Sequence, residues 1–93
     1  MNIKQIKVKN FQGESGAIPN QFIIKINDDY VYFQSYESII AKKDYNTGEI
    51  TLDPIYWDYS KTTGKYRNIF LNEPKALTEK KIKLGEYKLE NLN

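Results

Sequence analysis

The chain has 93 residues, the size of one small domain, and we treat residues 1–93 as a single domain. It contains no cysteine and no histidine, which excludes disulfides, thiolate metal sites and histidine-based acid–base catalysis. Fourteen basic and twelve acidic residues give a net charge of +2, too small to indicate a polyanion as the partner.

No apolar run approaches the roughly 20 residues that a helix needs to cross a bilayer. Residues 1–9 alternate between apolar and polar side chains, so we expect no signal peptide there. Together with the absence of cysteine, these patterns predict a cytoplasmic protein with no membrane partner.

Residues 3–11 predict a first strand with one solvated face, because apolar and lysine side chains alternate there. The two faces carry Ile6 with Val8 and Lys7 with Lys9. The glycines of residues 12–16 predict a loop, and Pro19 ends it before the next element.

The strongest strand pattern covers residues 21–26. Its alternate apolar residues, which share one face, are Phe22, Ile24 and Ile26. Residues 27–29 are Asn-Asp-Asp, which is typical of a hairpin turn because Asn and Asp tolerate positive φ. Residues 30–35 are rich in aromatic and β-branched side chains and return antiparallel.

Tyr30, Tyr32 and Tyr36 alternate on one side of that returning strand and its corner. If helices leave this side uncovered, it forms an exposed aromatic stripe. If helices cover it, Val31 and Phe33 face solvent instead. We favour the first arrangement.

A corner at residues 36–37 leads to a strand over 38–43. Residues 44–48 predict a longer hairpin loop, with Gly48 in the left-handed conformation. Residues 49–53 are the partner strand. The chain up to this point therefore predicts an antiparallel meander of about five strands.

A helix is predicted to follow, with Ser60 as its N-cap and with Asn72 and Pro74 at its end. Its inward side chains are Tyr66, Ile69 and Phe70, at helical spacing. Gly64 inside this helix costs roughly 1 kcal/mol relative to alanine. We interpret it as allowing a close approach of the helix to the sheet.

Thr78 is predicted to cap a second short helix through Leu84, with Gly85 just after its end. Residues 86–89 then predict a final strand. An alternative is one strand over residues 81–89, broken at Gly85. The order β-β-β-β-β-α-α-β predicts an α+β fold, with an antiparallel sheet of about five to six strands and one or two short helices packed on one face.

No catalytic, cofactor-binding or metal-ligating set emerges from the sequence. Residues 62–65 lack the earlier glycine and the following hydroxyl of a phosphate-binding loop. Asp28, Asp29, Asp53 and Asp58 match the spacing of no ion-binding loop. We therefore predict that the protein is not an enzyme, and a metal-dependent enzyme using Asp or Glu is a distant third hypothesis.

Residues 56–66 combine the only tryptophan with three tyrosines, hydroxyl residues and two lysines. We expect Trp57 to anchor the helix to the sheet, because aromatic side chains dominate small cores. The tyrosine, hydroxyl and lysine neighbours resemble a protein-binding surface. The candidate partner-binding residues are Tyr36, Glu37, Tyr56, Tyr59, Lys61, Thr62 and Lys65.

Residues 20–24, 33–41 and 56–66, followed by Phe70 and Leu71, resemble a group of small proteins of unknown function from phages and prophages of low-GC Gram-positive bacteria. Members tend to show a Ser-Tyr corner leading to Ala, a Trp-Asp-Tyr-Ser-x-Thr-Thr-x-Lys-Tyr/His motif and a Phe-Leu helix end. They have Ser or a larger residue at the position of Gly64. The resemblance implies a phage or mobile-element setting and no established activity.

Our first functional hypothesis is a non-enzymatic phage accessory protein that binds a host or phage protein, for example as an anti-CRISPR-like inhibitor of a host defence complex. The alternative is a nucleic-acid-binding accessory protein that uses Lys61, Lys65, Arg67 and the helix start. The single arginine among the 14 basic residues argues against a phosphate-reading surface. Pairing of an edge strand with a second copy would make a homodimer.

Overall fold

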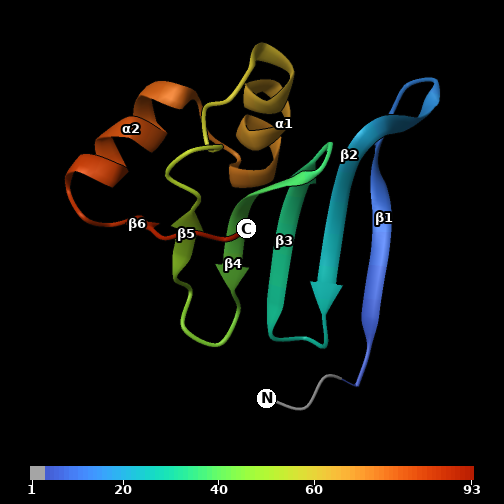
Figure 1. Cartoon of the computed structure of the whole chain (residues 1–93), viewed down its shortest axis with the longest axis horizontal. Coiled ribbons are helices and arrows are strands. Elements are labelled where there is room, and N and C mark those ends of the chain that lie inside the picture. The colour runs from blue at the N-terminus through green and yellow to red at the C-terminus, as the bar shows by residue number, and fades with distance from the viewer. Residues whose placement is uncertain (1–3) are drawn as a thin grey trace.

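The computed structural model describes residues 4–93 as one six-stranded sheet with two helices, which confirms the predicted α+β class (Figure 1). The strands follow one another across the sheet in chain order, and all neighbours are antiparallel except β5 and β6, which are parallel. The elements are β1 (Ile6–Gly13), β2 (Gly16–Ile26), β3 (Tyr30–Ser35), β4 (Ser38–Asp44), β5 (Ile50–Leu52), α1 (Lys61–Leu71), α2 (Lys75–Lys83) and β6 (Lys88–Leu89).

The two faces of the sheet differ in what covers them. Direct antiparallel partners share a face, and the row through Phe33 contains Ile23 and Ala41. Phe33 is fully buried beneath α1, with its ring 5.8 Å from that of Phe70. Tyr32 lies on the other face and is only partly buried. The helices therefore leave the Tyr32 side of the third strand uncovered, as favoured, but Tyr30 and Tyr32 are partly buried and do not form the exposed stripe expected with Tyr36. The core lies between the Phe33 face and the helices.

Aromatic contacts at its margin extend the buried apolar cluster. Phe11 on β1 packs edge-on against Phe33, with the ring centroids 5.4 Å apart, and at a tilt against Tyr66 of α1, also at 5.4 Å. The buried members are Val31, Phe33, Ile40, Ala41, Leu52, Phe70, Leu71 and Tyr87.

The first hairpin differs from the prediction. Strand β1 runs past the predicted end to Gly13, β2 begins at Gly16, and only Glu14 and Ser15 separate them, so the predicted loop over residues 12–16 is wrong. Pro19 lies inside β2, where the register between β1 and β2 shifts and the ladder is irregular. Because Pro19 has no partner in the ladder, the N–H that proline lacks costs no hydrogen bond there. The side chain of Asn10 bridges this irregularity by donating from Nδ2 to the Ile18 carbonyl at 2.9 Å.

The other turns follow their sequence signals. Asn27 has a φ of 52° and begins the predicted turn, and Gly48 has a φ of 78° in the loop between β4 and β5. Ser60 caps α1, with its Oγ accepting from the Thr63 N–H, and Asn72 ends that helix in the left-handed conformation. Gly85, with a φ of 75°, follows α2 as predicted.

Helix α2 starts earlier than predicted. It begins at Lys75 directly after Pro74, so Thr78 is not its cap. Thr78 is fully buried and donates from Oγ1 to Glu73 Oε2 at 2.7 Å. The helix continues to Lys83, so the alternative of one broken strand over residues 81–89 is wrong. Neither helix of residues 4–93 is long and apolar enough to cross a membrane.

Two buried carboxylates hold the C-terminal part of the chain to the sheet. Asp53, at the end of β5, accepts from the backbone N–H groups of Ile55 and Tyr56, each at 3.0 Å. Its other oxygen accepts from the Leu92 N–H at 2.8 Å and from Asn93 Nδ2 at 3.0 Å. Asp53 thus joins a strand end, the following turn and the chain terminus.

Glu73 does the equivalent for α2. Its Oε1 accepts from the Tyr87 hydroxyl at 2.6 Å and from Lys81 Nζ at 2.8 Å, while Oε2 accepts from Thr78. Burial and the bonded Glu73 carboxylate raise the pKa of the Tyr87 hydroxyl to about 12. Tyr87 therefore stays a neutral donor, and the end of α2 remains attached to its start.

We predict that the stability of the protein falls as the pH drops below about 5, and that Asp53 contributes to this. Burial alone would raise the pKa of Asp53, but its hydrogen bonds from Leu92, Asn93, Tyr56 and Ile55 outweigh burial and hold the pKa below the ordinary 3.8. A depressed pKa stabilises the fold above the ordinary value, and this stabilisation is lost as the pH falls through the folded value. Asp53→Asn should lower the melting temperature most at pH 7 and progressively less toward pH 2.

Thermal unfolding followed by circular dichroism across that pH range measures the effect. Asp28→Asn is the control, because the Asp28 side chain is 97% exposed and forms only a surface ion pair with Lys25. Parallel profiles for wild type and Asp53→Asn would contradict the role assigned to this carboxylate.

Candidate functional site

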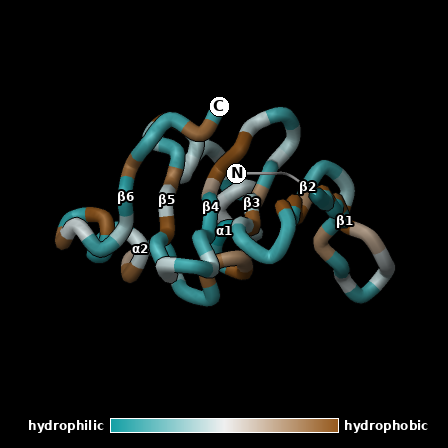
Figure 2. Tube along the Cα trace, turned by 90° about the horizontal axis from the view of Figure 1, so that it is seen from below, coloured by the Kyte–Doolittle hydropathy of each residue, from teal (hydrophilic) through white to brown (hydrophobic). Residues whose placement is uncertain are grey.

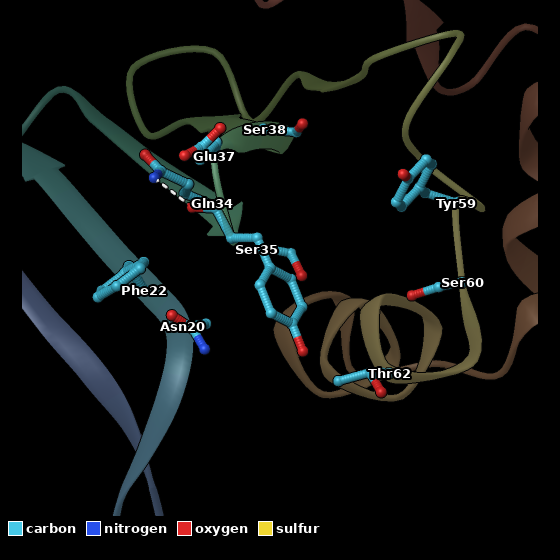
Figure 3. Close-up of a pocket in the computed structure, with 10 residues that line it drawn as sticks. Asn20, Phe22, Gln34, Ser35, Glu37, Ser38, Tyr59, Ser60 and Thr62 are labelled. Carbon is cyan, nitrogen blue, oxygen red and sulfur yellow. Dashed lines mark hydrogen bonds between the residues drawn. The ribbon is translucent and has the colours of Figure 1, made fainter.

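An open groove of about 900 Å³ lies between the β3–β4 corner and the start of α1 (Figure 3). We call it the Tyr36–Tyr59 groove. Glu37 and Ser38 border it from the corner, and Tyr59 and Thr62 border it from the helix side. The full lining is Asn20, Phe22, Gln34, Ser35, Tyr36, Glu37, Ser38, Tyr59, Ser60 and Thr62.

The corner side of the groove is held in an unusual backbone conformation. Tyr36 has a φ of 56° and Asn20 a φ of 63°, both in the left-handed region. The two are joined by a hydrogen bond from the Tyr36 N–H to the Asn20 carbonyl at 2.7 Å, and Gln34 Nε2 donates to the Tyr36 carbonyl at 2.7 Å. A tyrosine in this region costs about 1–2 kcal/mol. These bonds fix the tyrosine at a position where it is 51% exposed.

The helix side is tied to the corner by buried hydroxyl groups. The Oγ of Ser35, at the end of β3, lies 2.9 Å from Thr63 Oγ1 in the first turn of α1. Ser60 Oγ donates to the same Thr63 oxygen at 3.2 Å. These contacts set the width of the groove, because they connect its two walls through side chains with little freedom.

Tyr59 is the more exposed aromatic of the groove, at 66%. Its ring packs edge-on against that of Tyr56, with the centroids 5.5 Å apart. Tyr56 is partly buried against the core and does not line the groove. Tyr56 therefore supports Tyr59 from behind.

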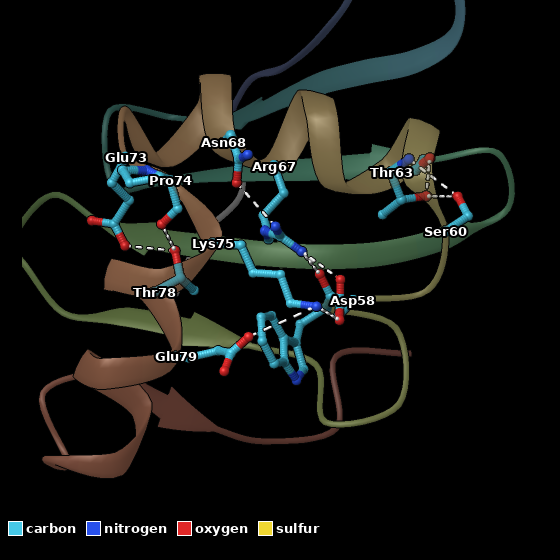
Figure 4. Close-up of polar contacts among 12 residues, drawn as sticks. Asp58, Ser60, Thr63, Arg67, Asn68, Glu73, Pro74, Lys75, Thr78 and Glu79 are labelled. Carbon is cyan, nitrogen blue, oxygen red and sulfur yellow. Dashed lines mark hydrogen bonds and ion pairs between the residues drawn. The ribbon is translucent and has the colours of Figure 1, made fainter.

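Arg67 fixes the segment that carries Tyr59 (Figure 4). It is 1% exposed, and its guanidinium lies 5.2 Å from the centre of the Trp57 ring. Nη1 donates to the Trp57 carbonyl at 2.8 Å and to Asp58 Oδ1 at 3.2 Å, and Nη2 donates to Asn68 Oδ1 at 2.9 Å. Arg67 is therefore a structural residue. Of the three basic side chains in the nucleic-acid hypothesis, only Lys61 and Lys65 are exposed.

Asp58 is shared between two cations. Besides Arg67, it binds Lys75 Nζ through Oδ2 at 2.6 Å, which links the segment before α1 to the start of α2. Burial alone would raise the pKa of Asp58, but the bonds from Lys75 and Arg67 outweigh it and lower the pKa. The carboxylate thus stays ionised and holds the two helices together.

Two interpretations of the helix need correction. Trp57 does pack against the core, but Ile69, expected to lie beneath it, is 55% exposed. Gly64 does not serve a close approach to the sheet. A Cβ at Gly64 would meet the Arg67 guanidinium first, at 3.6 to 3.9 Å, which is ordinary contact.

The structure brings together four of the seven predicted partner-binding residues: Tyr36, Glu37, Tyr59 and Thr62. Lys61 and Lys65 border a separate shallow hollow beside Lys75. The sequence reasoning missed Asn20, Phe22, Gln34, Ser35, Ser38 and Ser60. The signal for Asn20 was available, since asparagine tolerates positive φ and here follows a proline.

The fold and the groove together define a small α+β protein with an aromatic and hydroxyl-lined groove. The chain belongs to a family of unknown function (DUF8033), whose model matches residues 1–87. Neither the curated proteins nor the solved structures gave a significant match.

We predict that Gly64→Ala stabilises the protein by about 0.5–1 kcal/mol, because alanine favours the helix and its methyl group has room. Urea unfolding measures the change. Gly48→Ala is the matched control: Gly48 has open space around it but a φ of 78°, so alanine there should destabilise by about 1 kcal/mol. A loss of stability in Gly64→Ala would show that α1 packs more tightly at this point than the contacts indicate.

We also predict that Arg67→Lys destabilises the fold by about 2–4 kcal/mol, although the charge is kept. Lysine cannot reproduce the fork that binds Trp57 and Asn68 at once. Lys65→Met, at an exposed position of the same helix, should stay within about 0.5 kcal/mol of wild type. Equal stabilities of the two variants in urea would contradict a structural role for the guanidinium.

Proposed function

We propose that the protein is a non-enzymatic accessory protein of a phage or mobile element, which binds a host protein through the Tyr36–Tyr59 groove and inhibits it. A host defence complex is the target class that we propose, in the manner of an anti-CRISPR protein. The setting rests on the resemblance of residues 20–24, 33–41 and 56–66 to small phage and prophage proteins.

The observation that carries the proposal is the conformation of Tyr36. Within residues 4–93, the positive-φ positions are occupied by three glycines, three asparagines and this one tyrosine. Glycine and asparagine are the residues that tolerate the left-handed region, whereas tyrosine is strained there. Strain of this kind clusters at binding sites, where the side chain is needed despite the cost.

The chemistry of the groove supports binding more than catalysis. Tyrosine is enriched among the residues that dominate protein interfaces, because it combines a large apolar ring with a hydroxyl group. Among the described residues that line the groove, Glu37 is the only carboxylate, and none is a lysine or an arginine. A pair of converging acid and base groups, which general acid–base chemistry needs, is thus not part of this lining.

The proposal is tested in a low-GC Gram-positive host with an active CRISPR system. Expression of the chain should raise the transformation efficiency of a plasmid that the system targets, and the tagged chain should co-purify with a stoichiometric component of the defence complex. Recovery of nucleic acid alone, with no stoichiometric protein, would favour the alternative of a nucleic-acid-binding accessory protein and overturn the proposal.

We predict that Tyr36→Gly separates binding from stability. Glycine relieves a strain of about 1–2 kcal/mol and adds an entropic cost of about 0.5–1 kcal/mol, so the free energy of unfolding should change by about 1 kcal/mol or less. Loss of the ring should weaken partner binding by about 2 kcal/mol or more, a factor of about thirty. Urea unfolding and titration with the purified partner measure the two quantities.

Leu84→Ser is the control for this test, because Leu84 is an exposed apolar residue at the end of α2, outside the groove. It should leave partner binding unchanged. If Tyr36→Gly binds as wild type does, or if Leu84→Ser loses as much affinity, the groove is not the binding surface.

A further inference from the structure

Strand β1 forms one edge of the sheet, with β2 on its inner side and, within residues 4–93, no element on its outer side (Figures 1 and 2). The Gln5 carbonyl accepts from the Asn27 N–H of the adjoining turn, so the backbone groups of Gln5 point toward β2. Backbone groups alternate along an antiparallel strand. The N–H and C=O groups of Ile6 and Val8 therefore point toward the open edge, where a further strand can add.

The two faces beside this edge carry different side chains. On the face opposite the helices, Ile6 and Val8 are 55% and 60% exposed. On the other face, Lys7 stands directly opposite Lys25 of β2, and Lys9 stands opposite Ile23. An added strand would thus meet apolar side chains on one face and lysines on the other.

The lysine face contains a hollow of about 620 Å³, separate from the Tyr36–Tyr59 groove. Its floor includes Ile23 and Val31, and none of the residues from the described part of the chain that line it is acidic. The full lining is Lys7, Val8, Lys9, Ile23, Lys25, Val31 and Tyr45. Within residues 4–93, the one ion pair of these lysines joins Lys25 to Asp28 at 3.3 Å on the surface, a kind of pair that contributes little.

Like charges directly opposite one another on neighbouring strands destabilise a sheet. The charges of Lys7 and Lys25 therefore repel each other in the free protein. An anionic group in the hollow would attract both lysines and offset this repulsion. The same argument excludes a second copy of this chain as the best occupant. In a symmetric antiparallel pairing of two β1 strands, Lys7 and Lys9 would face the same lysines of the other copy.

From this geometry we infer that β1 adds an extended segment of a partner protein in which acidic and apolar residues alternate. The acidic side chains would face Lys7, Lys9 and Lys25, and the apolar ones would continue the surface of Ile6 and Val8. Backbone hydrogen bonds at the edge provide affinity, and the alternation provides specificity.

The test uses an acetylated, amidated seven-residue peptide of alternating glutamate and valine as the probe. Hydrogen exchange by NMR should show at least about tenfold slower exchange at the Ile6 and Val8 amides when the peptide is bound. The double variant Lys7→Glu, Lys9→Glu should weaken binding by at least about tenfold, because two attractive pairs become repulsive. The matched control Lys80→Glu, Lys83→Glu changes the net charge equally on α2 and should bind as wild type does.

Four results would overturn the inference. These are no slowing of exchange at Ile6 and Val8, equal binding of a lysine–valine peptide, or displacement of the probe by a single-stranded oligonucleotide at equal affinity. The fourth is slow exchange of these amides in the peptide-free protein that grows with protein concentration, since it would show a second copy at the edge. Tyr36→Gly should leave peptide binding unchanged, so failure at the groove and failure at this edge are distinguishable.

Discussion

The arrangement of the groove depends on one buried guanidinium. A positive charge that is 1% exposed is tolerated only when it is paired and hydrogen-bonded. Arg67 meets this requirement through the carbonyl of Trp57, the carboxylate of Asp58 and the amide of Asn68. Because its first two partners precede α1 in the chain, the guanidinium forces that segment to fold back on the helix. Tyr59 and Ser60 reach the groove for this reason.

Two carboxylates repeat this principle elsewhere in the protein. Asp53 joins the end of β5 to the chain terminus, and Glu73 joins the two ends of α2. Within residues 4–93 the fully or nearly fully buried side chains include eight apolar and seven polar or charged ones. Five of the polar residues, Ser35, Asp53, Thr63, Arg67 and Thr78, form side-chain hydrogen bonds, so polar contacts contribute to the specificity of the fold beside the apolar core.

The sheet was largely predictable from the sequence because its signals are local. Side-chain alternation placed the strands, and turn residues such as Asn27 and Gly48 placed the hairpins. The errors fall where a contact outside the element itself decides the structure. Thr78 has the chemistry of a helix cap, but its side chain is buried and its hydroxyl donates to Glu73 instead. Pro19 has the chemistry of a loop end, but the irregular ladder between β1 and β2 accommodates it.

The candidate site was predictable only in part, because only some of its signals are local. Tyr36, Glu37, Tyr59 and Thr62 could be selected because exposed aromatic and hydroxyl residues near turns are typical of interfaces. The buried residues that hold them in place could not, because Ser35 and Thr63 are 28 positions apart and their contact depends on the docking of α1. Nothing local distinguishes Arg67 from a surface cation until Trp57 and Asp58 are placed beside it.

The motif over residues 56–66 consequently has two parts that alternate along the chain. Trp57 and Asp58 hold Arg67, Ser60 caps α1, and Thr63 connects that helix to β3. Tyr59 and Thr62, in the positions between, point into the groove (Figure 3). The rigid residues determine where the exposed ones stand. A motif dense in aromatic and hydroxyl side chains can therefore specify both a surface and the residues that support it, within one short segment and the start of the helix that follows.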